Sequence, residues 1–277
     1  VFTAQERKEW EPVIKEGEER TGWNVRVETG SAKEMLSQLE KEEADWDVAF
    51  GVSADALEEG KEYWQTGKDA WTGYSAVSFV ILYNTNVVTY RELPTGWDSL
   101  LEPRWKGRVA VPDPLKSDMA ASVLTEAAKN SEKEEFLDLL AENMQYQMPE
   151  TFKEVEQGIS DGRYSIGVTS EEAAKAMLAA GQDVDYIDPE EGECFFEDGT
   201  AIRKRTPNLD ASEAFVTYTT CDDTKWLLRT QLLRQPAEDV AAENERSDED
   251  LKQRYSREQE VLNIWKLILE EKSGSAH

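Results

Sequence analysis

Apolar and polar residues along this chain alternate between two periods, and the change of period predicts alternating helices and strands. Residues 5–21 place apolar side chains three or four positions apart, which predicts a helix, and residues 23–28 alternate, which predicts a strand. A second strand is expected at 47–51, leading into a helix that begins at Ser53. This order of elements is typical of a parallel sheet with right-handed crossovers.

The rest of the chain continues the pattern. Residues 76–83 are the most apolar stretch and predict a buried strand, preceded by a turn at 71–74. Residues 234–240 are expected to be extended. The remaining expected helices lie at 32–42, 93–101, 131–145, 169–178, 210–221, 223–234 and 247–271. A turn and strand are expected at 160–168, and the remaining strands at 183–187 and 195–203. The chain is therefore expected to be an α/β protein.

One stretch, 106–124, combines a strand, a rigid turn and a helix start. Arg108 to Val111, which follow Gly107, are expected to form the strand, and the prolines at 112 and 114 end it because proline has no N–H for the ladder. Ser117 and Asp118 are good N-cap residues for the helix that follows. The free amides of a helix start favour an anion, although an ordinary strand–helix turn has the same sequence features.

The net charge of the chain limits the kinds of molecule that can bind it. The chain carries 31 basic and 58 acidic residues, a net charge of −27, which repels nucleic acids and anionic lipids. An anionic ligand would therefore need short-range hydrogen bonds in a shielded cleft. A 39% hydrophobic content with nine tryptophans predicts a globular protein, and no apolar run approaches a membrane span.

The termini and the cysteines add little. No charged-then-apolar leader is expected at the N-terminus, and 273–277 resembles a tag or linker remnant that holds His277, the only histidine. Cys194 and Cys221 fit no metal or redox spacing. A disulfide between them is one alternative outside the cytosol, and two free thiols are the other.

No catalytic motif is present in the sequence, and an enzyme is not expected. What recurs is a strand end that leads into a Ser- or Thr-capped helix, at Ser31, Ser53, Ser117 and the pair Thr169 and Ser170. Each alone is well explained as a cap. Together they favour a cleft that binds a small polar ligand without reacting with it.

Several longer stretches carry a family resemblance. The most specific is 94–107, PTGWDSLLEPRWKG, which resembles a "P.SW.DLL.PKYKG" pattern. The others are 18–25, 51–57, 83–86, 111–114, 162–168, 197–202 and 233–240. On these motifs the chain resembles type II periplasmic solute-binding proteins of ABC importers, in the branch that binds ferric iron, phosphonates and sugar phosphates.

The resemblance implies a two-lobed α/β fold with mixed sheets and a hinge. The lobes would be 1–80 plus 204–277 and 81–203, with crossing strands near 80–86 and 195–203. It also implies a monomeric receptor without a cofactor, located in the periplasm or lipid-anchored outside the cytoplasmic membrane. Such a receptor would capture a small polar solute, phosphorylated or of phosphonate type, by hinge closure and deliver it to the ABC permease subunits.

The ligand set departs from the family's ferric pattern. Ferric binders carry adjacent tyrosines where this chain reads 169–172, often a histidine where it reads Gln5 and Glu6, and an acidic ligand in the segment 51–53. Since all three features are missing, direct ferric coordination through a tyrosine pair is not expected. Phosphate-type members read SGT where this chain has Ser117, Asp118 and Met119.

The acidic residues suggest a further feature of the solute. Asp118 and Glu171 would suit an amine or hydroxyl, as in an aminoalkylphosphonate, although both are also ordinary helix-start residues. Tyr74 is expected to form a wall of the cleft, or else to be a core or hinge residue. The expected ligand-binding set is Ser31, Ser53, Tyr74, Ser117, Asp118, Met119, Thr169, Ser170 and Glu171. A ligand-sensing domain, a receptor for a metal ion or metal complex, and an enzyme on this fold are the alternatives.

Overall fold

The computed structural model describes residues 1–65, 70–192, 194–241 and 248–274. The chain divides into two compact units. The first contains Val1–Ala76 and Glu197–Ser256, and the second contains Val77–Phe196 and Arg257–His277. Both are mixed α/β structures, as the sequence predicts, and each is described by itself.

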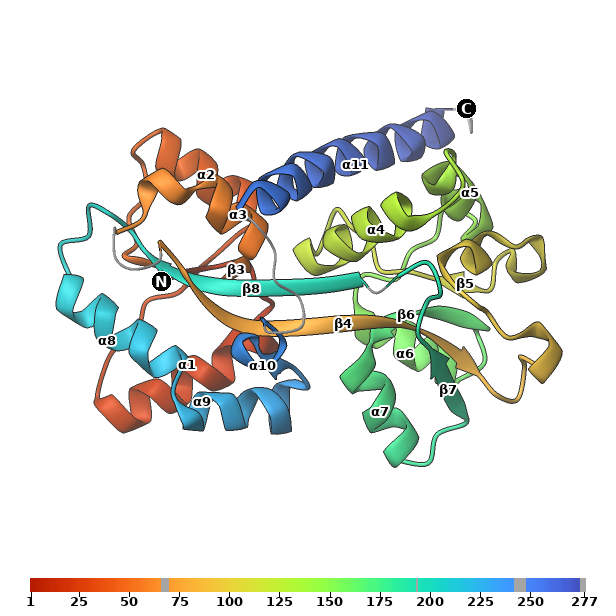
Figure 1. Cartoon of the computed structure of the whole chain (residues 1–277), viewed down its shortest axis with the longest axis horizontal. Coiled ribbons are helices and arrows are strands. Elements are labelled where there is room, and N and C mark those ends of the chain that lie inside the picture. Colours follow the sequence, from red (N-terminus) through yellow and green to blue (C-terminus); the bar gives the residue numbers. More distant parts are fainter. Residues whose placement is uncertain (66–69, 193, 242–247, 275–277) are drawn as a thin grey trace. The chain divides into compact units, whose positions relative to one another are not determined.

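The first unit is built on a mixed sheet (Figure 1). Strands β2 (Glu28–Thr29), β1 (Phe2–Thr3) and β3 (Val48–Ser53) are parallel neighbours in that order, and β8 (Cys194–Ile202) pairs antiparallel with β3. The start of β4 (Thr72–Asn84) pairs with β9 (Gln235–Pro236). The α-helices are α1 (Arg7–Thr21), α2 (Ala32–Glu40), α3 (Ala54–Glu59), α8 (Leu209–Thr219), α9 (Asp222–Leu227), α10 (Ala237–Ala241) and the beginning of α11 (Asp248–Gly274), with a 3-10 turn at Lys61–Tyr63 and a π turn at Leu228–Leu232.

Two apolar clusters form the core of the first unit. One contains Phe2, Trp46 and Trp64, all buried, together with apolar residues of α2 and α3. The other joins Phe50 of β3 to Phe215 of α8, with ring centroids 5.5 Å apart. Helix α1 ends at Gly22, whose left-handed φ of 74° is a common helix C-cap conformation.

The second unit has its own strands and helices. The later part of β4 pairs antiparallel with β6 (Ile166–Ser170) and β7 (Val184–Ile187), and β6 is parallel to β5 (Val109–Ala110). Its α-helices are α4 (Asp118–Asn130), α5 (Phe136–Asn143), α6 (Phe152–Ser160), α7 (Glu171–Ala179) and the rest of α11, and its 3-10 turns are Tyr90–Glu92, Trp97–Leu101 and Pro103–Trp105.

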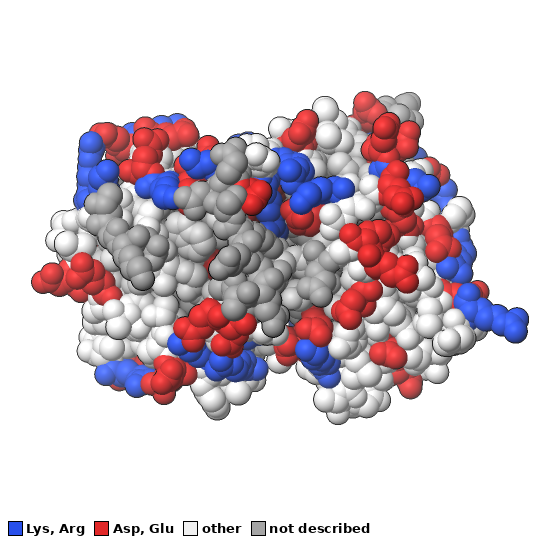
Figure 2. All heavy atoms as spheres, viewed as in Figure 1, with Lys and Arg blue, Asp and Glu red and all other residues white. Residues whose placement is uncertain are grey.

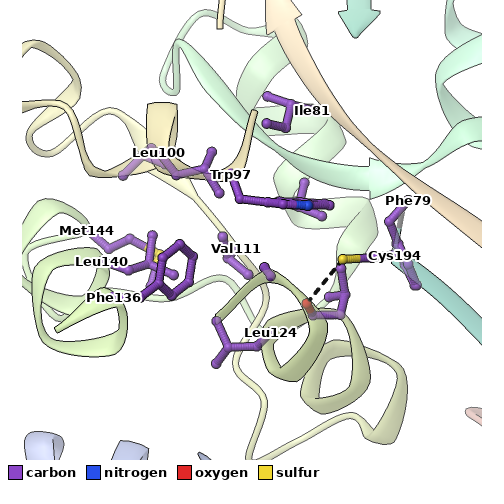
Figure 3. Packing of buried hydrophobic residues seen from close by; sticks show 14 of the residues in the cluster. Phe79, Ile81, Trp97, Leu100, Val111, Leu124, Phe136, Leu140, Met144 and Cys194 are labelled. Atoms are coloured by element: carbon purple, nitrogen blue, oxygen red, sulfur yellow. Dashed lines mark hydrogen bonds between the residues drawn. The ribbon is translucent and has the colours of Figure 1, made fainter. Parts of the chain in front are cut away.

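Apolar packing from distant parts of the sequence stabilises the second unit. Figure 3 shows Trp97 and Leu100 on one side of Val111, with Phe136 and Leu140 on another. The buried members of this cluster come from strands, helices and 3-10 turns. Burial of this apolar surface is the main favourable contribution to the stability of the unit.

Several local predictions were wrong. In 23–28 only Glu28 joins a strand, because Trp23, Val25 and Val27 pack against the Phe50 cluster without ladder partners. The expected turn at 71–74 already lies within β4 from Thr72 onward. A 3-10 turn replaces the helix expected at 93–101, and the helix expected at 131–145 is limited to α5. The helix expected at 223–234 ends in the π turn. The segment expected to be extended, 234–240, contains β9 followed by α10. Helix α6 was not predicted.

The cysteines, the C-terminal residues and the surface charges have these places in the structure. Both cysteines are free: Cys194 is buried and Cys221 half-buried. Of the stretch 273–277, residues 273 and 274 continue α11, and the other three, including His277, lie outside the described residues. No described helix combines the length and the apolar character needed to cross a membrane. Asp and Glu side chains are spread over the visible face, with Lys and Arg between them (Figure 2).

The predicted lobe boundary after residue 80 lies close to the boundary of the compact units after Ala76, and both fall in β4. The other predicted boundaries differ more from those of the compact units. The compact units divide between Ala76 and Val77, between Phe196 and Glu197, and between Ser256 and Arg257. The sequence-based division into 1–80 plus 204–277 and 81–203 stays a prediction about lobes.

Candidate functional site

Two predicted helix starts of the second unit lie at one edge of its sheet. Strands β5 and β6 are parallel neighbours, with Val109 opposite Ile166. The chain leaves β5 toward α4 and leaves β6 directly into α7, so both helices begin beyond the carboxyl ends of adjacent strands. In open α/β sheets this edge is the usual place for a ligand.

The hydroxyls at these two helix starts are N-caps. Ser117 Oγ accepts a hydrogen bond from the Ala120 amide at 3.3 Å, and Ser170 Oγ accepts one from the Ala173 amide at 3.2 Å. A hydroxyl that accepts a cap bond still has its own hydrogen to donate. Both serines can therefore act as caps and as donors to a ligand.

The acidic residues at the same edge follow the caps directly. Asp118 is the first residue of α4 and is half-buried. Glu171 is the first residue of α7 and forms a 2.9 Å ion pair with Lys175. The side chain of Met119 is partly buried against the core cluster of the unit. A cationic group that binds Glu171 would share its carboxylate with Lys175.

Thr169 has a different environment from its neighbour. It lies in β6, is fully buried, and donates from its hydroxyl to Glu156 Oε1 at 2.7 Å. The prediction that a helix begins at Thr169 was wrong, because Ser170 is the N-cap of α7. The Thr169 hydroxyl instead joins β6 to α6.

The first unit places two predicted serines beyond the ends of its parallel strands. Ser31 follows β2 and forms a capping box with Glu34: the Glu34 amide donates to Ser31 Oγ at 3.2 Å, and the Ser31 amide donates to Glu34 Oε2 at 2.8 Å. Ser53 ends β3, is 3% exposed, and accepts from the Ala56 amide at 3.4 Å. The Glu34 carboxylate already occupies the start of α2, so an anion there would have to compete with it.

Tyr74 lies in the core of the first unit. It is 2% exposed, and its ring centroid is 4.7 Å from that of Phe50. Its hydroxyl has no hydrogen-bond partner among the described residues. Burial, reinforced by the nearby Asp198 carboxylate, raises the pKa of Tyr74 well above 10, so the hydroxyl stays protonated.

The sequence did not reveal a buried ionic network around Arg234. The Arg234 side chain is 4% exposed. Its Nη1 lies 2.6 Å from Asp198 Oδ2 and donates to Ser75 Oγ at 2.8 Å. Its Nη2 lies 3.1 Å from Glu9 Oε1. Asp198, which is fully buried, also accepts from Gln5 Nε2 at 2.9 Å. We call Gln5, Glu9, Ser75, Asp198 and Arg234 the Arg234 network.

Opposing effects act on the two central charges of this network. Burial raises the pKa of Asp198, while Arg234 and the hydrogen bonds from Ser75 and Gln5 oppose the rise. Burial on its own would lower the pKa of Arg234, but Glu9 and Asp198 outweigh it and leave that pKa raised. The guanidinium is therefore a permanent charge. No spacing or motif in one sequence predicts this network, since its members are up to 225 positions apart.

Gly51 gives a local test of this packing. It sits at a register shift between β3 and β8 with a left-handed φ of 61°, and a Cβ there would lie 2.3 Å from Gln5 Cδ. We expect Gly51→Ala to lower the free energy of unfolding by about 1–3 kcal/mol from backbone strain alone, and by more because Gln5 must also move.

Urea unfolding measures this loss of stability, with Gly22→Ala as the control. The φ angle of Gly22 is 74°, but no atom lies within 4 Å of a Cβ added at Gly22. Equal losses in the two variants would contradict the packing argument.

Among the described residues, no group of three or more His, Cys, Asp and Glu side chains is placed to hold a metal ion. Each unit, taken by itself, therefore presents capped helix starts, and the first unit also contains the buried Arg234 network.

Comparison with known proteins adds a family and a fold. Residues 23–259 match the profile of a family described as "Bacterial extracellular solute-binding protein". No curated protein sequence matches the chain.

Solved structures share the fold at low sequence identity. A ferric binding protein from Campylobacter jejuni is 16% identical with a TM-score of 0.76, and the match covers 96% of this chain and 98% of that one. The periplasmic binding protein AfuA from Actinobacillus pleuropneumoniae, with fructose-6-phosphate bound, is 14% identical with a TM-score of 0.77 over 97% of each chain. A protein titled as a two-component system protein in signal transduction is 19% identical with a TM-score of 0.68 over 91% of each chain.

Proposed function

The chain belongs to the family of bacterial extracellular solute-binding proteins, and from that premise we propose that it captures a small polar solute outside the cytoplasm and delivers it to the permease of an ABC importer. Capture would occur between two lobes, and bound solute would stabilise their closed arrangement. The protein would act as a monomer and carry out no reaction on the solute.

We infer that the solute carries a phosphate or phosphonate group. The observation that supports this most directly is the pair of helix starts at adjacent parallel strands, α4 and α7, capped by Ser117 and Ser170. Such starts offer amide and hydroxyl donors and a positive dipole end to an anion. A structural neighbour is titled as holding fructose-6-phosphate, which agrees with this inference.

The acidic residues refine the solute class. Asp118 and Glu171 begin the same two helices, and carboxylates there suit an amine or hydroxyl at the other end of the solute. From the first lobe, Ser31 and Ser53 would donate hydrogen bonds, whereas Tyr74, which is 2% exposed, fits the core alternative rather than a wall. Met119 would complete the surface around the anion, and the buried Thr169 would support that surface through its hydrogen bond to Glu156.

A ligand screen tests the proposal. A true solute stabilises the folded state by about 2.7 kcal/mol at a concentration of 100 Kd, so it raises the melting temperature in a dose-dependent way. The probes are inorganic phosphate, fructose 6-phosphate, an aminoalkylphosphonate, a neutral polyol and ferric citrate. A shift with the phosphorus compounds supports the proposal. A shift only with the polyol or ferric citrate would contradict the anion site.

The two cap hydroxyls allow a direct test of the site. We expect Ser117→Gly combined with Ser170→Gly to weaken binding of the best phosphorus probe at least tenfold, because the loss of two hydrogen bonds at about 1 kcal/mol or more each exceeds 1.4 kcal/mol. Glycine replaces a serine cap at a cost of only a few tenths of a kcal/mol, so folding should be retained.

Isothermal titration calorimetry measures this change. Thr89→Gly is the matched control. Thr89 begins the Tyr90–Glu92 turn, where its amide donates to Glu92 Oε2 at 3.2 Å, and it follows the end of β4, which lies opposite the start of β6. Unchanged affinity in the double variant, or an equal loss in Thr89→Gly, would place the solute elsewhere.

A sensing role is the second candidate, because one structural neighbour is titled as a two-component system protein. A sensor would bind the same solute and pass the signal to a partner kinase rather than to a permease. Solute uptake by membrane vesicles containing the cognate permease separates the roles, since only a transport receptor would stimulate it. A metal or metal-complex receptor remains the third alternative, which the ferric citrate probe tests.

A further inference from the structure

Three elements belong to both compact units. The unit boundaries fall within β4 between Ala76 and Val77, within β8 between Phe196 and Glu197, and within α11 between Ser256 and Arg257. Any change in the arrangement of the units must therefore be absorbed by these three elements. Hinges are usually a few residues that take up such a change.

In the first unit, buried charges hold the two strands immediately beside their boundaries. Ser75 is next to the boundary residue of β4, and Asp198 is next to the boundary residue of β8. The Ser75 amide and hydroxyl donate to Asp198 Oδ1 at 3.1 and 2.8 Å, and Arg234 bridges the two residues. The strands are thus joined by directional bonds away from water, where such bonds are strongest.

Backbone packing adds a second restraint in the same place. A Cβ on Gly199 would lie only 2.8 Å from the Thr72 carbonyl oxygen, so β8 approaches the β4 backbone closely there. Helix α11 is held in a similar way, because Arg254 Nε lies 3.2 Å from Asp55 Oδ2 and both side chains are buried. In the first unit, therefore, β8 and α11 each contribute a residue to a buried ion pair, and β4 is hydrogen-bonded to the ion pair of β8.

In the second unit, backbone hydrogen bonds join β4 to β6 from Phe79 onward, and apolar contacts hold the same elements nearer the boundaries. Val77 and Phe79 of β4, Phe196 of β8, and Val261 and Trp265 of α11 are all buried members of one hydrophobic cluster. Apolar burial is non-directional, so it tolerates small shifts of one element past another. Ion pairs with fixed hydrogen-bond geometry tolerate them much less.

We propose that Arg234 is a positioning residue for hinge closure, which fixes the starts of β4 and β8 to the first unit through Ser75 and Asp198. Bending is thereby confined to the residues beyond Ala76 in β4 and before Glu197 in β8. The inference rests on the proposed function, because it assumes that solute capture proceeds by a hinge motion. The Arg234 network takes no part in contacting the solute.

The spread of inter-unit distances in the ligand-free protein tests this. Spin labels are attached to Lys33→Cys on α2 and Lys153→Cys on α6, both exposed, in a Cys221→Ser background that leaves only the buried Cys194 as a native thiol. Electron–electron double resonance then gives the distance distribution. Since no ligand is added, the result is independent of the ligand screen.

Asp198→Asn and Ser75→Ala are expected to broaden the distribution, because each removes bonds that join the two strands. Ser75→Ala keeps both charges and so remains informative where Asp198→Asn fails to fold. Asp47→Asn is the matched control: Asp47, in the same unit, accepts from Thr206 at 2.6 Å and Asn208 at 3.1 Å, but lies on no connecting element. An unchanged distribution in Ser75→Ala, or equal broadening in Asp47→Asn, would overturn the proposal.

Discussion

Replacing Arg234 with methionine is expected to lower the free energy of unfolding by about 3–5 kcal/mol, the usual cost of removing one partner from a buried ion pair. The variant leaves Asp198, which is fully buried, with hydrogen bonds only from Gln5 and Ser75 among the partners described above. An uncompensated carboxylate away from water is costly because few groups replace its hydration. Urea unfolding at pH 7.5, followed by circular dichroism, measures the loss.

An exposed ion pair in the same unit gives the control. Arg229 lies 2.6 Å from Asp239, and the two side chains are 50% and 38% exposed. Arg229→Met should therefore cost at most about 1 kcal/mol. Comparable losses in the two variants would mean that burial does not set the energy of the Arg234 network.

The destabilisation by Arg234→Met should also depend on pH. The folded protein raises the pKa of Asp198 above its ordinary value of 3.8, and loss of the cation raises it further. A carboxyl with a raised folded pKa favours folding when it is protonated, and this contribution is lost as the pH rises through the folded pKa. The difference between variant and wild type should thus shrink as the pH falls through the raised pKa values of Asp198, which lie above 3.8. Glu9 also faces the guanidinium, at 3.1 Å, and Tyr74 stays neutral throughout. An equal difference at pH 3.5 and 7.5 would contradict this account.

Trp97→Ala is expected to have a similarly large effect on the second unit, about 3–5 kcal/mol, as is usual for truncating a buried aromatic side chain. Trp97 is 0% exposed in the main apolar cluster (Figure 3). Its Nε1 also donates to the Gly192 carbonyl at 3.0 Å. The substitution therefore leaves a cavity and removes a hydrogen-bond donor from the part-buried Gly192 carbonyl. Thermal and urea unfolding measure the loss.

Trp226→Ala is the control for this substitution. Trp226 is 58% exposed, so its truncation should change the free energy of unfolding by no more than about 0.5 kcal/mol. If Trp97→Ala cost no more than Trp226→Ala, the packing in Figure 3 could not be the source of stability for this unit.

The sequence by itself determined the features that depend on neighbouring residues. Ser31, Ser53, Ser117 and Ser170 each cap a helix as predicted, because an N-cap needs only a short polar side chain and an amide three residues later. The long apolar run of β4 and the long periodic run of α11 were also predictable, since local periodicity reports on burial. The family followed from motifs of the same local kind.

Only the tertiary structure decided which polar groups are buried together. Trp23, Val25 and Val27 alternate like a strand but serve to cover the Phe50 cluster, and Thr169 lies in β6 rather than at a helix start. The Gln5–Asp198 bond joins residues 193 positions apart, so no local pattern could predict it. Hydrogen bonding and burial are properties of groups brought close by folding, and a single sequence specifies these contacts only through the whole fold.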